Sequence, residues 1–479
     1  MSIAVVMKGV PMRKSIFRGN TVSRRGLLRS GLVLGVGTVA AMALSGCGEE
    51  EEVAAPAPAA TAAPTQVVAA TEAPPSMEKV TIKMWTASVE DINPIHEEEV
   101  ANFTSMMPNV SIDLTLVPWS DVQTKQLTSL AAGDKPDIAY THSELNSTFA
   151  WRGVLQSLDE YMAADGDFDR DDFFAGPLEN LSYRGKVNGV PMYSGPVIFV
   201  YNREMIGELG FDDPWEMYQE GNWTIDAYEQ IVRAAATGSG ADRIYGDREL
   251  PNALKIWWLW IQGFDGQVWN DKVSESLMHE ANALKTWDWL TTLVKDEVWA
   301  DSTVTGAFSG GAEGMFVSRK MPFYTASRWV TTNIPEEFPA ATAPMYKMPN
   351  GDDNGRDGTD GVGMHADTKH PDEAWAVLKH WATDVMDRFV EIRYTNPTRR
   401  SVLNSPAWAA AMATWDNVEV HNASLEQIRR GFYHPPGYRE INTILKKAYD
   451  EVKLGQKNSA DAFSAIKPDI DAILQESSE

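Results

Sequence analysis

The stretch "KVTIKMWT", residues 79–86, places Val80, Ile82 and Met84 at alternate positions. An alternation of apolar residues with a period of two predicts a β-strand that buries one face. The three apolar side chains share that face, and the polar residues between them lie on the other. Residues 79–86 therefore predict the first strand of a sheet.

The segments that follow this strand repeat an order of strands and helices. Residues 110–117 alternate again, and residues 136–142 form a short apolar run, so both segments are predicted strands. Residues 96–107 have a helical composition, and residues 120–133 form a second predicted helix with Ser120 as its N-cap. The order strand, helix, strand, helix, strand predicts an α/β sheet with parallel members.

The N-terminal end of the chain has the pattern of an export signal. Residues 1–46 contain seven Lys or Arg and no Asp or Glu, and a 14-residue apolar run spans residues 31–44. Such a run reaches about 21 Å as a helix, less than the roughly 30 Å core of a bilayer. Arg24 and Arg25 resemble a twin-arginine signal, although general export stays open. "LSGC", which ends at Cys47, resembles a bacterial lipobox, and this resemblance implies that Cys47 is lipidated.

Residues 47–78 are rich in Ala, Pro, Thr and Glu and poor in large apolar residues. This composition cannot form a core, so it predicts a disordered tether. About 30 residues of such a chain have a root-mean-square reach of roughly 30 Å. We therefore expect an extracytoplasmic protein that is attached to the cell membrane through the lipid on Cys47 and held clear of the headgroups by the tether.

The net charge and the cysteine count exclude several classes of function. Without the seven basic residues of the predicted signal, the chain has 35 Lys and Arg and 67 Asp and Glu, which gives a net charge of −32. So acidic a surface repels phosphate backbones and anionic headgroups, which argues against nucleic acid as a partner and against electrostatic docking on membranes. Because Cys47 is the only cysteine, no disulfide and no cysteine-ligated metal site can form within the chain.

About 400 residues follow the tether, and because a single core rarely grows to that size we expect two domains. The 17 tryptophans suit both a large core and a pocket for ligands with apolar faces. Residues 165–172 and 350–360 resemble calcium loops, but Gly176 and Gly361 stand where the EF-hand pattern needs glutamate. We therefore predict no metal site, and the absence of nucleotide motifs predicts no cofactor.

Seven segments between residues 80 and 474 occur in a recognisable order. They are "LTSLAAGDKPDIAY", "LQSLDEYMAADGDFDRDDFF", "GKVNGVPMYSGPVIFVYNREMI", "NWTIDAYEQIVRAA", "FSGGAEGMFVSRKMPFYTASRW", "GVGMHADTKHPDEAWAVLKHWA" and "NPTRRSVLNSPAW". In this order and spacing they resemble the family 1 extracellular solute-binding proteins, which are the sugar-type receptors of ABC importers. The resemblance covers essentially the whole chain after the tether.

The resemblance implies a type II periplasmic-binding-protein fold, in which two α/β lobes are joined by hinge crossings and close on a ligand between them. By position, the crossings are expected near residues 194–202, 340–347 and 393–400. Lobe 1 would then comprise residues 79–197 plus 345–392. Lobe 2 would comprise residues 198–344 plus 393–479.

A sugar ring presents hydroxyls at its rim and C–H groups on its faces, so its receptor needs flat aromatic side chains and planar polar partners. In open α/β sheets the ligand lies beyond the carboxyl ends of the strands. The candidate ligand-binding residues follow predicted strands, lie in the Trp-rich segment or match family positions near the crossings: Trp85, Thr86, His142, Ser143, Glu144, Tyr193, Trp257, Trp258, Arg328, Trp329, Asp360 and Gly361.

Each candidate also has a purely structural interpretation. Trp85 could be a core tryptophan, and His142 could be a loop histidine. Trp257 and Trp260 share one side of a helix while Trp258 points elsewhere, so the three cannot all line one pocket. Arg328 stands where the family commonly shows a glycine, so it either binds a sugar hydroxyl or lies on the surface.

For the function, the resemblance implies a binding protein rather than an enzyme. We expect a monomer that captures a mono- or oligosaccharide by hinge closure and delivers it to the permease subunits of an ABC importer. One alternative is an extracytoplasmic carbohydrate-active enzyme, which would need two carboxylates a few ångströms apart. The other alternative is a sensory receptor without transport. Polyols and glycerol phosphate esters stay open as ligands.

Overall fold

The computed structural model describes residues 78–250, 254–353, 355, 357–389, 396–412, 419–428 and 434–477. The predicted export signal, Cys47 and nearly all of the predicted tether lie outside these residues, and what the sequence predicts for them stays a prediction. Within the described ranges, no helix is both long and apolar enough to cross a membrane.

A parallel sheet opens the described chain, as the sequence predicts. Its strands and the helices between them are β1 (Val80–Ser88), α1 (Asn93–Met106), β2 (Val110–Pro118), α2 (Val122–Ala132) and β3 (Ile138–His142). β1 lies parallel to both β2 and β3, which confirms the predicted order and direction of these strands. The predicted cap at Ser120 is wrong. Ser120 lies in a 3₁₀ turn after Pro118, and its hydroxyl donates to the Asp121 carboxylate, so α2 begins two residues later.

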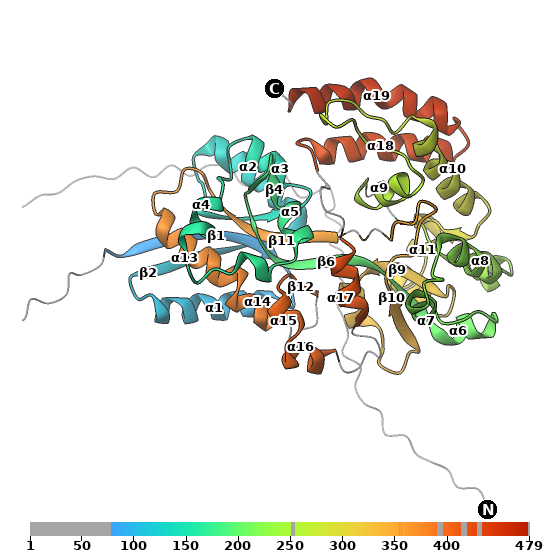
Figure 1. Ribbon diagram of the computed structural model, residues 1–479, viewed down its shortest axis with the longest axis horizontal. Coiled ribbons are helices and arrows are strands. Elements are labelled where there is room, and N and C mark those ends of the chain that lie inside the picture. The colour runs from blue at the N-terminus through green and yellow to red at the C-terminus, as the bar shows by residue number, and fades with distance from the viewer. Residues whose placement is uncertain are drawn as a thin grey trace, which may run out of the picture. The chain divides into compact units, whose positions relative to one another are not determined.

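One long strand, β6, changes its neighbours halfway along its length. The strands concerned are β6 (Val190–Asn202), β9 (Phe323–Ser327), β10 (Ala340–Ala343), β11 (Asp357–Met364) and β12 (Asn396–Pro397). Up to Pro196, β6 pairs antiparallel with β11 and β12. From Val197 onward it pairs with β9 and β10. The main path of the sheet is β10-β6-β11-β3-β1-β2, and β6 runs between two groups of elements (Figure 1).

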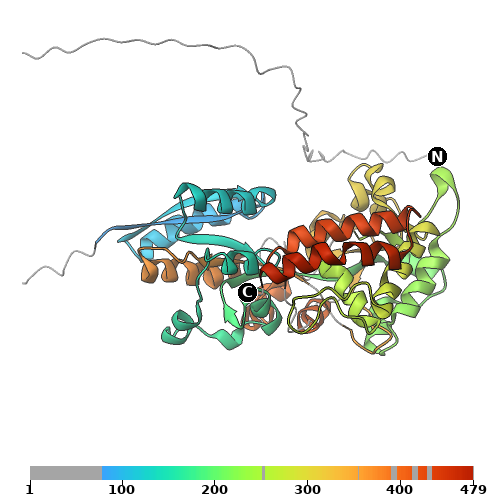
Figure 2. The ribbon, with the colours of Figure 1, turned by 90° about the horizontal axis from the view of Figure 1, so that it is seen from above.

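Two large hydrophobic cores correspond to the two halves of β6. The first core contains many of the buried residues within 80–193 and 362–389, and the second core contains many of those within 197–348 and 438–474. The helices that pack in them include α13 (Pro371–Ala382) and the short α14 (Asp384–Phe389) in the first core, and α8 (Ile225–Ala235), α9 (Leu254–Gly263), α10 (Ala281–Lys295), α18 (Tyr438–Lys453) and α19 (Ser459–Glu476) in the second. α18 and α19 lie side by side (Figure 2).

The two lobes stay a prediction, but the cores bear on their limits. Met345 and Tyr346 pack in the second core, although the predicted first lobe resumes at residue 345. Val362 packs in the first core. The chain therefore passes from the second core to the first after Met348 and before Val362.

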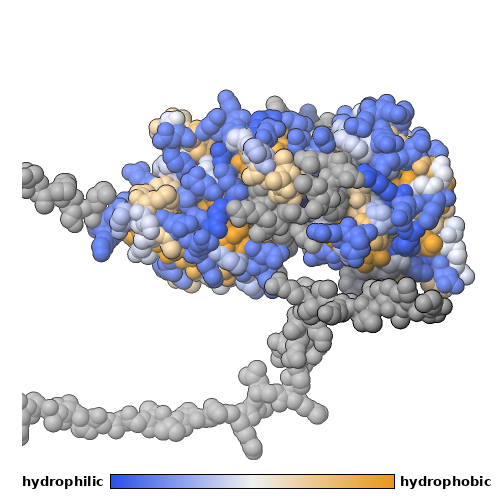
Figure 3. Space-filling model, turned by 90° about the horizontal axis from the view of Figure 1, so that it is seen from below, coloured by the Kyte–Doolittle hydropathy of each residue, from blue (hydrophilic) through white to orange (hydrophobic). Residues whose placement is uncertain are grey.

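The remaining elements are short. They are α3 (Asn146–Trp151), α4 (Asp159–Ala164), α5 (Ala175–Asn180), β4 (Ser182–Tyr183), β5 (Lys186–Val187), α6 (Arg203–Glu208), α7 (Pro214–Gln219), β7 (Asp247–Arg248), β8 (Trp299–Ala300), α11 (Ser302–Gly306), α12 (Gly311–Val317), α15 (Arg400–Leu403), α16 (Pro406–Ala411) and α17 (Glu419–Glu426). Val420 of α17 packs with Ile198 and Val200 of β6, and Leu425 packs with Phe174. α17 thus packs both against β6 and against the segment that precedes α5. Hydrophilic residues cover much of the described surface in Figure 3, as the acidic composition leads us to expect.

Candidate functional site

Polar and aromatic side chains gather near the carboxyl ends of β2 and β3. We call Trp119, Tyr140, His142, Tyr193 and Asp360 the strand-end cluster. Asp360 of β11 lies opposite His142 of β3 on one side and opposite Tyr193 of β6 on the other. The Tyr140 hydroxyl donates to the Asp360 carboxylate. The rings of Trp119 and His142 meet edge to face, with their centroids 5.9 Å apart. Three of the predicted site residues, His142, Tyr193 and Asp360, are thereby brought together.

Burial determines the protonation state of Tyr140 in this cluster. The side chain is fully buried, and its desolvation, together with the neighbouring Asp360 and Tyr193, raises the pKa of Tyr140 well above the usual value. Tyr140 therefore stays a neutral hydroxyl that donates to a carboxylate. A site that combines hydroxyl, carboxylate and imidazole groups offers both donors and acceptors, which is what a ligand with several hydroxyl groups requires.

Trp119 is the most accessible ring of the strand-end cluster, because 44% of its surface is exposed. The Arg439 guanidinium of α18 lies 5.0 Å from the centre of this ring. The same side chain donates a hydrogen bond of 3.1 Å to Oε1 of Gln123 in α2, and its Nε lies 3.8 Å from Oε2 of Glu144. A helix of the second core thus reaches side chains on the segments that follow β2 and β3, whose neighbouring residues Val117, Val122 and Leu145 pack in the first core.

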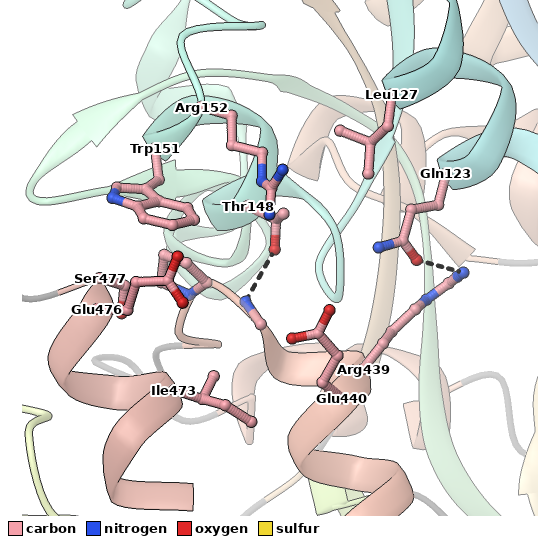
Figure 4. A pocket seen from close by; sticks show the side chains of 12 residues that line it. Gln123, Leu127, Thr148, Trp151, Arg152, Arg439, Glu440, Ile473, Glu476 and Ser477 are labelled. Atoms are coloured by element: carbon pink, nitrogen blue, oxygen red, sulfur yellow. Dashed lines mark hydrogen bonds between the residues drawn. The ribbon is translucent and has the colours of Figure 1, made fainter.

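Beside this contact lies a cavity of about 50 Å³, which we call the α3–α18 cavity. Its lining comes from α2, α3, α18 and α19 and includes Gln123, Thr148, Trp151, Arg439, Glu440 and Ser477 (Figure 4). The backbone N–H of Gly437, just before α18, donates to Oγ1 of Thr148 at 3.3 Å. The cavity therefore lies between elements of the two cores and shares Gln123 and Arg439 with the surroundings of the strand-end cluster.

The candidates at the end of β1 and after β3 are buried next to the cluster. The Trp85 ring packs in the first core, with the Lys125 ammonium 4.3 Å from its centre. Thr86 and Ser143 are buried, and their hydroxyls make no hydrogen bond within the described residues. A buried hydroxyl without a partner costs about 1–3 kcal/mol, so these two groups favour a nearby water or ligand hydroxyl. Glu144 is partly buried, and its N–H donates to Nδ1 of His142.

The tryptophans of α9 are packed among other rings of the second core. Trp257 meets Trp287 edge to face at 5.2 Å, and Trp258 meets Trp269 in the same manner at 4.8 Å. Trp260 donates its indole N–H to the Tyr346 hydroxyl at 2.9 Å. All three α9 rings are buried. The structure therefore places Trp257 and Trp258 apart from the strand-end cluster, in an aromatic core.

Arg328 follows β9 and is buried, with 1% of its surface exposed. Its guanidinium lies 4.8 Å from the centre of the Trp408 ring in α16. Burial and the Arg328 charge lower the pKa of His421 well below the usual value. Arg328 thus lies among α16 and α17 and not on the surface. Trp329 follows in a 3₁₀ turn, and its side chain lies outside the part that the structure describes.

Gly361 serves the packing of the sheet. A methyl group at this position would overlap Leu181 and the carbonyl oxygen of Val190, so the absence of a side chain lets β11 approach β6. Of the candidate metal loops, residues 165–172 are fully described, and no group of three or more His, Cys, Asp or Glu that could hold a metal ion occurs among the described residues.

Sequence reasoning missed Trp119, Trp151 and Arg439. Trp119 directly follows β2, so the rule that ligands lie beyond strand ends could have found it. No local signal marks Arg439, because it comes to Trp119 and Glu144 from a helix about 300 residues further along the chain.

The chain matches the family described as bacterial extracellular solute-binding protein over residues 87–386. A binding protein of Brucella abortus (strain 2308) is 21% identical over 408 residues, which cover 83% of this chain and 93% of that protein. The maltotriose-binding protein of Pyrococcus abyssi is 20% identical over 398 residues, which cover 73% of this chain and 77% of that protein.

Two solved structures are similar over most of the chain. The ABC substrate-binding protein of Listeria monocytogenes in complex with cycloalternan has a TM-score of 0.71 and 18% identity, and covers 82% of this chain and 99% of its own. The sugar-binding protein MalE of Xanthomonas citri has a TM-score of 0.71 and 21% identity, and covers 83% and 98%. These likenesses confirm the predicted fold class, a periplasmic-binding fold of the maltose-binding-protein kind.

Proposed function

Because the chain belongs to the family of bacterial extracellular solute-binding proteins, we propose that it is the substrate-binding lipoprotein of an ABC importer. It captures a carbohydrate between two lobes and delivers it to the permease. The carbohydrate is a mono- or oligosaccharide. The protein acts as a monomer that binds its ligand without changing a covalent bond.

The observation that carries this proposal is the exposed ring of Trp119 in the strand-end cluster, together with Arg439, whose side chain lies close to both this ring and Glu144. A flat ring matches the C–H face of a sugar, and buried hydroxyl and partly buried carboxylate groups match its rim. Polar groups that are buried without a correct partner cost free energy, so these groups also select among sugars. The names of the similar proteins agree with this ligand class, because they include a maltotriose-binding and a sugar-binding protein.

The change of partners along β6 supports the proposed closure of two lobes. We place the first hinge crossing at Pro196 and Val197, where the strand leaves β11 and joins β9. We place the second crossing between Met348 and Val362, where the chain passes from the second core to the first. A ligand that touches both the strand-end cluster and α18 binds the closed arrangement better than the open one. It therefore shifts the population towards closure, which the permease recognises.

The anchor rests on Cys47 and the tether. A lipid on Cys47 keeps the protein at the outer face of the cell membrane, while the acidic body stays free to meet the permease. Labelling of cells with a radioactive fatty acid tests this part. The wild-type chain should incorporate label and sediment with membranes, and the Cys47→Ser variant should do neither. Equal labelling of both chains would contradict lipidation at Cys47.

A thermal-shift screen of the mature chain with Cys47→Ser against a panel of sugars and polyols tests the ligand class. A ligand at 100 times its dissociation constant adds about 2.7 kcal/mol to the free energy of unfolding. Chromatography of the mixture then separates receptor from enzyme, because a receptor returns its ligand unchanged. Conversion of the sugar into products would establish a hydrolase instead, and no shift with any carbohydrate would refute the proposed ligand class.

A further inference from the structure

The α3–α18 cavity lies next to the proposed sugar site but is formed by different residues. Arg439 joins the two places, because its guanidinium lies over Trp119 and also lines the cavity. Gln123, which accepts a hydrogen bond from Arg439, lines it too. A ligand that rests on Trp119 and extends past Arg439 would therefore enter the cavity.

The lining of the cavity has the composition of a sugar subsite. Trp151 supplies a second, partly exposed indole at the end of α3 (Figure 4). Thr148 and Ser477 supply a hydroxyl from each side of the cavity. Arg152 and Arg439 are balanced by Glu440 and Glu476, so the lining has no net charge and favours a neutral ring.

The size of the cavity indicates how a ring would sit. A volume of about 50 Å³ exceeds the roughly 10–15 Å³ that a cavity needs to hold one water molecule, but it is small for a whole pyranose. The exposed residues Arg152, Glu440 and Glu476 lie around it. A hydroxyl or hydroxymethyl group thus fits inside, while the ring itself lies at the mouth against Trp151.

We propose that the α3–α18 cavity is a second subsite that takes the next ring of a neutral oligosaccharide, with Trp151 as its stacking residue. This inference rests on the proposed carbohydrate binding and narrows it to ligands of two or more rings. A ring in this subsite touches α3 of the first core and α18 and α19 of the second, so longer ligands also favour closure more strongly.

Calorimetric titration of the mature chain with malto-, cello- and xylo-oligosaccharides of one to five rings tests the inference. Uronic-acid oligomers of the same lengths are included. For the sugar series that binds, Trp151→Ala should lower the affinity for oligosaccharides by about tenfold or more. It should leave the affinity for the monosaccharide unchanged. Trp215→Ala is the matched control, because Trp215 is also partly exposed but stacks on Tyr218 in α7. It should change neither affinity.

The possible results separate the two proposals. One result is that neutral sugars bind while Trp151→Ala lowers the affinity for one-ring and three-ring sugars equally, or lowers neither affinity. In that case the proposed second subsite is wrong, and the proposed carbohydrate receptor stands. If the uronic-acid oligomers bind more tightly than the neutral ones, the argument from balanced charge is wrong. If no sugar of any series binds, the proposed function fails and the subsite fails with it.

Discussion

Removal of the exposed Trp119 indole is the most direct test of the proposed sugar site. The Trp119→Ala substitution removes the flat ring that we propose stacks on the face of the sugar. The buried members of the strand-end cluster, Tyr140, His142 and Tyr193, are kept. A tryptophan side chain buries at most about 150–250 Å². With 44% of Trp119 exposed, a ligand can cover about 90 Å² of it.

At about 25 cal/mol per Å², that area corresponds to about 2 kcal/mol, or roughly a thirtyfold change in the dissociation constant. The wild-type chain gains about 2.7 kcal/mol at 100 times its dissociation constant. At the same ligand concentration the variant should gain only about 0.9 kcal/mol. Without ligand, the variant loses the contacts of Trp119 with Arg439 and with the His142 ring, which contribute about 0.5–1 and about 0.5–1.5 kcal/mol to the free energy of unfolding.

The assay is urea unfolding with and without the sugar that the screen selects, with Trp215→Ala as the control. The control should keep the full ligand effect. A Trp119→Ala variant that also keeps it would refute the placement of the ligand on this ring. A variant that unfolds without added urea would show instead that Trp119 supports the fold, against its exposure.

Three further predictions concern buried residues. Gly361→Ala should lower the free energy of unfolding by about 1–3 kcal/mol, because the added methyl group overlaps the neighbouring strand; Gly207→Ala, where the space is open, should not, and urea unfolding compares the two. Trp257→Ala should lower the free energy of unfolding by about 3–5 kcal/mol, while the folded fraction keeps its affinity for the ligand. A stable variant that loses this affinity would show that Trp257 contacts the ligand. Burial lowers the pKa of His96 to about 4, so its contribution to stability is present above the unfolded pKa near 6.5 and is lost as the pH falls towards 4. Wild-type protein should lose about 2 kcal/mol from this residue between pH 7 and pH 5, and an equal loss in His96→Gln would contradict that assignment.

Local patterns were sufficient for the first strands and their order. Val80, Ile82 and Met84 alternate because one face of β1 is buried, and that requirement is visible in the sequence itself. The positions just after β3 were found in the same way, since His142 ends a strand whose apolar run is unmistakable. The match over residues 87–386 agrees with the family that the order of segments indicates.

Local patterns could not separate pocket residues from core residues. Trp257 and Trp258 have the same composition and spacing whether they face a ligand or other rings, and the structure surrounds them with Trp287 and Trp269. Arg328 likewise turned out to lie beneath the Trp408 ring, which comes from a helix that the sequence does not connect with it.

The sequence by itself therefore determined the first strands and the residues that follow β3, because periodic burial is a property of neighbouring residues, and the order of its segments indicated the family and, through it, the class of fold. Only the tertiary structure decided that Arg439 meets Trp119 and Gln123, and that Trp151 and Ser477 line one cavity. Such contacts join segments about 300 residues apart. Packing of whole helices against each other fixes them, and no local pattern records that packing.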